Sequence, residues 1–325
     1  MRASKATPGT INPIIAKKIN TVIKPNPGIS YGNVPSKGEA FLSKNIHVIC
    51  DKPLTHNLGD AEKFLESVKK SKALFALTHN YTGYPMVRQA REMFRNGEIG
   101  NLRVIQVEYA QDWLTLPIEN EGQKQASWRT DPSKAGIGGS IGDIGSHAFN
   151  LVDFITGAKL DELCADISSF VPGRKNDDNA HVLLRYENNV KGMLWSSQVA
   201  PGNENALRIR IYGDKGGMEW EQENPNYLTI DIFGKAKKII RRAGNETIDI
   251  GNRITRIPPG HPEGYLEGFA NIYSDFAKQI LAFKDNQKPE KDILLVPSIE
   301  DGVKGVKFIT TVVESGSNGG KWIKF

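Results

Sequence analysis

Cysteine is almost absent from this sequence of 325 residues, which holds only Cys50 and Cys164. Two thiols so far apart form neither a disulfide framework nor the paired ligands of a zinc site. Long apolar runs are missing as well: no stretch approaches the about 18 apolar residues of a membrane helix, and none follows the charged N-terminus as a secretory signal requires. We therefore expect a cytoplasmic protein with reduced cysteines, Cys50 in the core and no membrane partner.

A strong excess of one charge is also lacking, since the net charge is only +5. The densest basic run, Lys235–Arg242, contains the apolar Ile239 and Ile240 and follows the segment Tyr227–Phe233 across Gly234. This pattern is typical of a solvated β-hairpin. A lone basic run is weak evidence for nucleic-acid binding, and we expect no nucleic-acid partner.

Patterns of secondary structure can be recognised from Ile46 onward, because prolines interrupt the candidate helices of residues 1–45. Ile46–Cys50 and Ala73–Leu77 are short apolar runs, typical of strands buried on both faces. Between them, Asn57 can cap a helix whose apolar stripe is Leu58, Ala61, Leu65 and Val68. Strand, helix and strand in this order predict a parallel βαβ unit.

From Leu102 onward the pattern changes to alternation, with Ile105, Val107 and Tyr109 against Gln106 and Glu108. Such alternation predicts antiparallel strands with one buried face. Further strands are expected near residues 162–169, 180–186, 190–198 and 217–221, and helices near 141–156, 265–283 and 298–314. The sequence thus predicts an α/β chain: a partial doubly wound parallel sheet in residues 1–82, then an α+β domain with a large, mostly antiparallel sheet in residues 83–325.

Two candidate catalytic residues, Asp143 and His147, lie four residues apart on the helix expected from Ile141. A carboxylate beside an imidazole can hold the ring in one orientation and make it a better base near neutral pH. An ordinary surface ion pair is the alternative. The glycine-rich run Gly136–Gly142 ahead of them lets the backbone approach another molecule closely or turn sharply into the helix.

Lys52 follows directly on the first buried strand. In open parallel sheets, ligands lie outside the carboxyl ends of the strands, so this lysine is a candidate site residue. Pro53 restricts the Lys52 backbone to an extended conformation. A solvated lysine at the start of a loop is the alternative.

Two further clusters have side chains suited to a polyhydroxylated ligand. Trp128 and Arg129 offer an aromatic ring beside a bidentate donor, although Arg129 could equally form a structural pair with Asp131. His261 stands in a proline-rich loop before a helix, where it could face a pocket or only cap and pack.

Four separated segments, taken in order, resemble the Gfo/Idh/MocA oxidoreductases: Ile46–Leu54, Gly138–His147, Gly260–Tyr265 and Asp301–Phe308. The resemblance covers residues 46–325. It implies an NAD- or NADP-dependent dehydrogenase or reductase that transfers a hydride between the nicotinamide and a sugar, an inositol or a related polyol. It also implies a Rossmann-like, dinucleotide-binding first domain and a homo-oligomer joined through the C-terminal sheet.

The same resemblance implies roles for single residues. Asp51-Lys52-Pro53 stands where the family has Glu-Lys-Pro and would bind the cofactor, with Lys52 also contacting the substrate hydroxyl. His147 would be the general acid/base, with Asp143 beside it. Trp128, Arg129 and His261 are the expected substrate-binding residues, and no metal ligand is expected.

The first domain departs from the family pattern, because no Gly-x-Gly-x-x-Gly occurs anywhere in the sequence. βαβ units of roughly 30 residues each would normally precede Ile46, where only 45 residues stand. We expect a truncated or divergent dinucleotide-binding domain and weak binding of NAD(P).

Two alternatives to a hydride-transferring enzyme remain open. One is a non-catalytic relative that binds a sugar, or serves as a subunit, and has lost cofactor binding. The other is a metal-dependent sugar isomerase or lyase, in which Asp143, His147 and His261 would form a triad of two histidines and one carboxylate.

Overall fold

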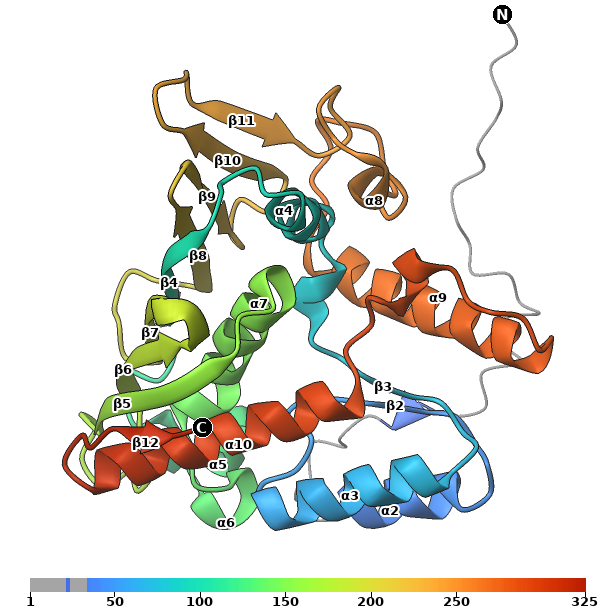
Figure 1. The fold of residues 1–325 in the computed structure, drawn as a ribbon. Helices are drawn as coiled ribbons and strands as arrows, with labels where there is room; N and C mark the ends of the chain where they lie inside the picture. Colours follow the sequence, from blue (N-terminus) through green and yellow to red (C-terminus); the bar gives the residue numbers. More distant parts are fainter. Residues whose placement is uncertain (1–21, 24–33) are drawn as a thin grey trace, which may run out of the picture.

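The computed structural model describes residues 22–23 and 34–325 and contains two sheets (Figure 1). The smaller sheet is parallel, with strand order β1-β2-β3, where β1 is Val22–Ile23, β2 is Val48–Cys50 and β3 is Phe75–Leu77. The expected parallel βαβ unit is therefore confirmed, and its first strand pairs on the other side with β1. Cys50 is buried, as expected.

The helix between β2 and β3 is α3, Leu58–Lys70. The Asn57 side chain accepts a hydrogen bond from the backbone N–H of Asp60 at 2.9 Å, which confirms Asn57 as the N-cap. Ala61 and Phe64 are buried against the sheet. Local signals in this segment thus agree with the position of the helix.

Both faces of the small sheet are covered, and much of the cover comes from the far end of the chain (Figure 1). On one face, Val48 and Cys50 pack in a cluster with α3, α2 (Val34–Leu42) and α10 (Ile299–Ser317). On the other, Ile49 packs against Ile272, Phe276 and Ile280 of α9, Tyr265–Lys284. Alternate residues of one short strand therefore enter two different cores.

The larger sheet has nine strands in the order β11-β10-β9-β8-β4-β7-β6-β5-β12. Within the described residues every neighbouring pair is antiparallel except β4 with β7, which confirms the mostly antiparallel sheet. The strands are β4 Leu102–Ala110, β5 Leu160–Ser168, β6 Asn179–Tyr186, β7 Lys191–Ser197, β8 Ala206–Gly213, β9 Gly216–Glu221, β10 Tyr227–Ile232, β11 Lys238–Arg241 and β12 Ile323–Lys324.

The main hydrophobic core lies between one face of this sheet and the helices α4, Pro85–Arg95, α7, Ser146–Thr156, and α10. The helix expected over residues 141–156 is divided, because Ile141–Gly145 forms a π-helical turn ahead of α7. The remaining short helices are η2 Asn80–Gly83, η3 Ile118–Glu121, α5 Lys124–Arg129, α6 Pro132–Ala135, η5 Glu187–Asn189, α8 Asp249–Asn252 and η6 Lys291–Leu294.

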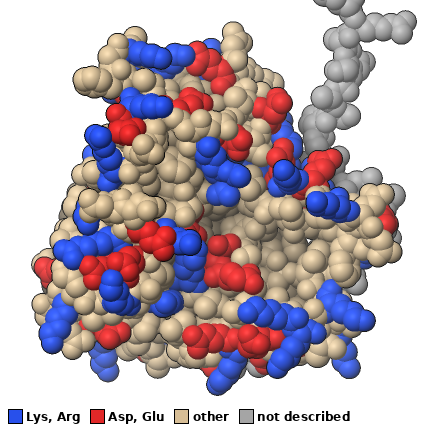
Figure 2. Space-filling view, in the orientation of Figure 1, with Lys and Arg blue, Asp and Glu red and all other residues tan. Residues whose placement is uncertain are grey.

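The basic run at Lys235–Arg242 lies at the β10–β11 hairpin, as predicted. Lys237 and Lys238 pair with Asp231 and Glu246. Acidic and basic side chains are interspersed over the face seen in Figure 2. No helix of the described residues is both long and apolar enough to cross a membrane.

A buried ion cluster connects α4 to α9. Arg88 is fully buried and donates to Asp275 Oδ2 at 2.7 Å and to the carbonyl oxygen of Thr82 in η2 at 3.0 Å. Arg253 approaches the other carboxylate oxygen of Asp275 at 2.7 Å. Since α9 covers the small sheet and α4 packs on the large one, this cluster helps to join the two halves.

Replacing Asp275 with alanine is expected to lower the free energy of unfolding by about 3 to 5 kcal/mol, because Arg88 would keep its charge in a buried site without a partner. Denaturant unfolding at neutral pH measures the change. Asp161→Ala, which removes one of the two carboxylates paired with the exposed Lys324, is the control and leaves the unfolding midpoint unchanged. Equal effects of the two substitutions would contradict the structural role of the cluster.

Candidate active site

A cavity of about 370 Å³ opens where the small sheet meets the large one. Asp51 and Lys52 reach it from the carboxyl end of β2, and Thr78 and Asn80 reach it from the carboxyl end of β3, which is where ligands bind in open parallel sheets. The lining residues are Asp51, Lys52, Thr78, Asn80, Tyr81, Tyr109, Gln111, Arg129, Asp143, Ile144, His147, Asn205, Tyr265 and Phe269.

Both the backbone and the side chain of Lys52 are held at this edge by hydrogen bonds. Its ammonium donates to the Asp143 carboxylate at 3.1 Å and to the Asp143 carbonyl oxygen, and only 12% of its side chain is exposed. Its backbone N–H donates to Asp51 Oδ1 at 2.9 Å, an oxygen that also accepts from the Thr78 hydroxyl at 2.7 Å. The lysine is therefore an oriented charge in the pocket rather than a solvated loop residue.

Asp143 is the acceptor at the centre of the site. Besides Lys52, its carboxylate accepts from Arg129 Nε at 2.9 Å and from Gln198 Nε2 at 3.0 Å. Burial acts to raise the pKa of this carboxyl group, but the charges and hydrogen bonds of Lys52 and Arg129 outweigh it and lower the pKa to about 2. Asp143 is ionised at neutral pH.

His147 lines the same cavity, but no hydrogen bond joins its ring to the Asp143 carboxylate. Its Nδ1 is buried without a partner among the described residues. The ring instead packs edge-on against Tyr81 and His79, at centroid distances of 5.0 and 5.5 Å. The interpretation that Asp143 orients the imidazole is therefore wrong: aromatic packing orients the ring, and Asp143 orients Lys52.

The pKa of His147 is well below its usual value, first because of burial and then because of the positive charge of Lys52 and the neighbouring His79. The imidazole is consequently neutral at pH 7. A neutral imidazole next to an ammonium group can accept a proton from a hydroxyl whose oxygen lies near the lysine.

The glycine-rich run at residues 136–142 lets the backbone lie close to another segment of the same chain. Gly139 lies against the backbone of Asp177, where a Cβ would collide with the Asp177 carbonyl oxygen. The buried carboxylate of Asp177 accepts from the backbone N–H groups of Gly139 and Ile141 and from the Ser140 hydroxyl, at 2.7 to 2.8 Å. This anchor fixes the π-helical turn that carries Asp143.

The expected substrate-binding residues are not all brought together. Arg129 lines the cavity, and its guanidinium lies 4.2 Å from the ring centroid of Trp128 and 5.7 Å from that of Trp113. Trp128 is not among the residues that line the cavity, but its ring packs against the guanidinium of Arg129. Pro53 follows Lys52 but does not line the cavity either.

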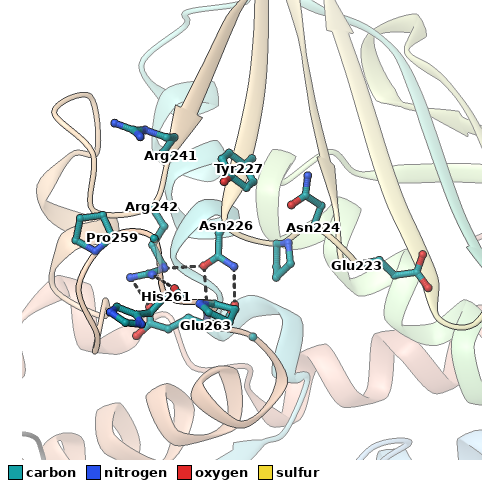
Figure 3. A pocket seen from close by; sticks show the side chains of 13 residues that line it. Glu223, Asn224, Asn226, Tyr227, Arg241, Arg242, Pro259, His261 and Glu263 are labelled. Atoms are coloured by element: carbon teal, nitrogen blue, oxygen red, sulfur yellow. Dashed lines mark hydrogen bonds and ion pairs between the residues drawn. The ribbon is translucent and has the colours of Figure 1, made fainter.

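His261 lies elsewhere, in a separate cavity of about 430 Å³ (Figure 3). There Arg242 holds the loop before α9: it donates to Asn226 Oδ1 at 2.6 Å and to the carbonyl oxygen of His261, and it forms an ion pair with Glu263 at 3.0 Å. The expectation that His261 binds substrate alongside His147 is not met, and the triad of Asp143, His147 and His261 is not assembled. Over residues 22–23 and 34–325, no group of three or more metal-ligating side chains is found.

Several lining residues were missed from the sequence. Thr78 and Asn80 follow β3 as Lys52 follows β2, so the strand-end rule that found Lys52 would have found them too. Tyr109 is on β4, and Asn205 directly precedes β8. For Tyr109 and Asn205, the alternation of apolar and polar residues along the strands did not indicate that the side chains line a pocket.

A parallel sheet with a lysine, an aspartate and a histidine at its carboxyl edge, joined to a large antiparallel sheet, defines a class of two-part oxidoreductase. A family model described as GFO/IDH/MocA C-terminal domain matches residues 87–219. Uncharacterized oxidoreductase YfiI of Bacillus subtilis strain 168 is 33% identical over 292 residues, which are 88% of this chain and 74% of that protein. The chain belongs to the Gfo/Idh/MocA family of oxidoreductases, as the motifs predicted.

Solved structures agree. The crystal structure of an oxidoreductase from Sinorhizobium meliloti is 50% identical with a TM-score of 0.80, covering 93% of this chain and 78% of that one. The inositol dehydrogenase homolog of Azotobacter vinelandii, complexed with NADH and myo-inositol, is 29% identical with a TM-score of 0.82, covering 92% of this chain and 76% of that one. The predicted α/β fold class is confirmed.

The buried His79 predicts a dependence of stability on pH. Burial, and then the charge of Lys52, lower its pKa from 6.5 to about 3. Between these values the unfolded chain binds a proton that the folded chain does not, so the free energy of unfolding falls as the pH drops. His79→Gln is expected to remove about 2 kcal/mol of the loss between pH 7 and pH 5.

Urea unfolding of both proteins at pH 5, 7 and 8 measures this difference. Between pH 7 and pH 8 the gap between the two proteins stays constant, because the imidazole is largely uncharged there in both states. An equal loss in the two proteins between pH 7 and pH 5 would mean that folded His79 takes up the proton as readily as the unfolded chain.

Proposed function

We propose that this protein is an NAD- or NADP-dependent oxidoreductase that transfers a hydride between the nicotinamide and a hydroxyl-bearing carbon of a sugar, an inositol or a related polyol. The observation that carries the proposal is the convergence of Lys52, Asp143 and His147 on one cavity at the carboxyl ends of two parallel strands. The family, and a relative of known structure that holds NADH and myo-inositol, support it.

The residues present at the strand ends fit a nicotinamide cofactor. Asp51 and Lys52 offer polar groups there, and the adjacent Asn80 has a buried Nδ2 without a partner among the described residues. Such an unsatisfied donor is costly unless a ligand accepts from it. We assign Asp51 and Lys52 to the cofactor side of the pocket, with Pro53 contributing by restricting the backbone of Lys52. The bound nicotinamide supplies the hydride acceptor or donor.

The protein's own part in the reaction is proton transfer and charge stabilisation. In the oxidative direction, neutral His147 takes the proton of the substrate hydroxyl as the carbon–hydrogen bond breaks. The ammonium of Lys52 stabilises the negative charge that develops on the oxygen. Asp143 keeps that ammonium in place, and Arg129 and Gln198 keep Asp143 in place.

The rest of the pocket suits a polyhydroxylated substrate. Tyr81, Tyr109, Gln111, Asn205 and Arg129 all present hydrogen-bonding groups to the cavity. A site lined in this way favours a ligand that carries several hydroxyl groups, because each buried polar group needs a partner.

His147→Ala is expected to lower kcat by about 10² to 10⁴ with a smaller change in KM, because general acid/base catalysis supplies about that factor. Formation of reduced nicotinamide with a panel of sugars and inositols, using NAD and NADP in turn, is the assay. His261→Ala, which removes an imidazole from the separate cavity, serves as the matched control and keeps full turnover. A His147→Ala protein within about twofold of normal turnover would exclude this base.

Lys52→Ala is expected to lose a comparable amount of activity, and Lys52→Arg to regain little of it. A planar guanidinium cannot occupy the place of a compact ammonium that donates to both the carboxylate and the backbone carbonyl oxygen of Asp143. Steady-state kinetics of both variants give the comparison. Binding of a polyol without turnover in the unaltered protein would identify a non-catalytic relative instead.

We also propose that the open face of the large sheet joins copies of this chain. The side chains of Val104, Leu183, Met193 and Tyr212 point away from the core and are 39 to 50% exposed. They belong to adjacent strands, β4, β6, β7 and β8, and several exposed apolar side chains on one face of a sheet favour an interaction surface.

The double substitution Leu183→Glu and Met193→Glu is expected to convert the oligomer to monomers, because it buries like charges in the proposed interface. Sedimentation at micromolar concentration reports the assembly state. Leu294→Glu, at an exposed leucine away from the sheet, is the control and leaves assembly unchanged. A monomeric unaltered protein would refute the interface.

A further inference from the structure

A continuous chain of hydrogen bonds forms one wall of the pocket. The Trp113 indole donates to Gln111 Oε1 at 3.0 Å, and Gln111 Nε2 donates to Asn205 Oδ1 at 2.8 Å. The hydroxyl of Tyr109 donates to the same Asn205 oxygen at 2.7 Å and lies 2.5 Å from the hydroxyl of Tyr81. All of these residues except Trp113 line the cavity that holds His147.

The direction of every bond in this chain follows from Trp113, because an indole N–H can only donate. Gln111 must therefore turn its carbonyl oxygen to the indole and its amide nitrogen to Asn205. Asn205 in turn must present its oxygen to Gln111, and this oxygen also accepts the single hydrogen of Tyr109. A side-chain amide has its oxygen on one side and its nitrogen on the other, so these bonds fix the orientation of the Asn205 amide group.

The same reasoning fixes the two phenols. Since the hydrogen of Tyr109 is used on Asn205, the short contact between the phenols requires Tyr81 to donate to Tyr109. Tyr81 is uncharged at neutral pH, because burial raises its pKa to about 12. Its hydrogen is used within the chain, and its oxygen is left with lone pairs only.

Two groups of opposite character are left for a ligand. The Asn205 amide hydrogen-bonds to the Tyr81 side chain, which leaves the second hydrogen of Asn205 Nδ2 for a ligand, whereas Tyr81 Oη can only accept. Both side chains bond to the same Tyr109 hydroxyl, so they lie within about two hydrogen-bond lengths of each other. The ring of Tyr81 also packs against His147, which places this pair beside the proposed base.

We propose that Tyr81 and Asn205 select a vicinal diol: one hydroxyl of the substrate donates to Tyr81 Oη, and the oxygen of an adjacent hydroxyl accepts from Asn205 Nδ2. Trp113, Gln111 and Tyr109 are positioning residues that set the polarity of the pair. The inference rests on the proposed function for the reacting carbon at His147, but the recognition itself concerns binding. A ligand without either hydroxyl leaves the second hydrogen of Asn205 Nδ2 or a lone pair of Tyr81 Oη without a partner.

The test compares ligands in pairs: myo-inositol and D-glucose, each with its set of monodeoxy analogues. For the unaltered protein, the analogue that lacks one hydroxyl of the recognised pair is expected to bind about 10- to 100-fold more weakly, and analogues changed elsewhere to bind more nearly as the parent does. Calorimetric titration measures the dissociation constants, and kcat/KM is measured separately with NAD and NADP.

Two substitutions then test the polarity. Asn205→Asp keeps an oxygen for Tyr109 and Gln111 but replaces the donating Nδ2 with an acceptor, so discrimination between parent and analogue is expected to fall to within about threefold. Trp113→Phe removes the indole N–H at a residue outside the cavity lining and releases the Gln111 amide, with the same expected loss of discrimination. Trp322→Phe is the matched control and keeps full discrimination, because Trp322 directly precedes β12 and does not line the pocket.

The outcomes separate the two proposals. Selective binding with no turnover would leave the vicinal-diol site standing and refute the proposed function. Turnover or binding that is equal for parent and analogues, no binding by any polyol of the set, or a Trp113→Phe protein with unchanged discrimination would each overturn the inference. A general loss of packing in Trp113→Phe would weaken parent and analogues by the same factor, and this too would overturn it.

Discussion

The ion pair between Lys52 and Asp143 is the contact on which the arrangement of the site depends. Lys52 stands at the end of a strand in the small sheet, and Asp143 stands in the π-helical turn that precedes α7 under the large sheet. A carboxylate in this place would be costly to bury alone, and so would the ammonium. Pairing them offsets both costs, joins the two sheets at the pocket, and fixes a positive charge in the cavity that His147 also lines.

Much of the fold could be predicted because its signals are local. β2, β3 and α3 follow from short apolar runs and from a helical stripe with Asn57 at its start, and the large sheet follows from alternation of apolar and polar residues. The place of Lys52 in the site could be predicted for the same reason, since the end of a buried parallel strand can be recognised in the sequence.

The rest of the site depends on contacts that no local pattern contains. Asp143 and His147 are four residues apart, a spacing that makes neighbours on an α-helix, but the π-helical turn at Ile141–Gly145 winds more widely and separates the two side chains. Asn205 reaches the pocket from a segment almost a hundred residues beyond Tyr109. His261 was assigned by type and family position, whereas Arg242 and its partners hold that loop in a different cavity.

The cover of the small sheet has a consequence for how the protein is made. Both α9 and α10, which close the two faces of β2 and β3, are synthesised after the entire large sheet except β12. At about 5 to 20 residues per second, the two strands leave the ribosome on the order of ten seconds or more before α10 does. During that interval their apolar faces lack part of their native partners, so the first-made strands are among the last parts of the molecule to reach a finished core, and chaperones have longest access to them.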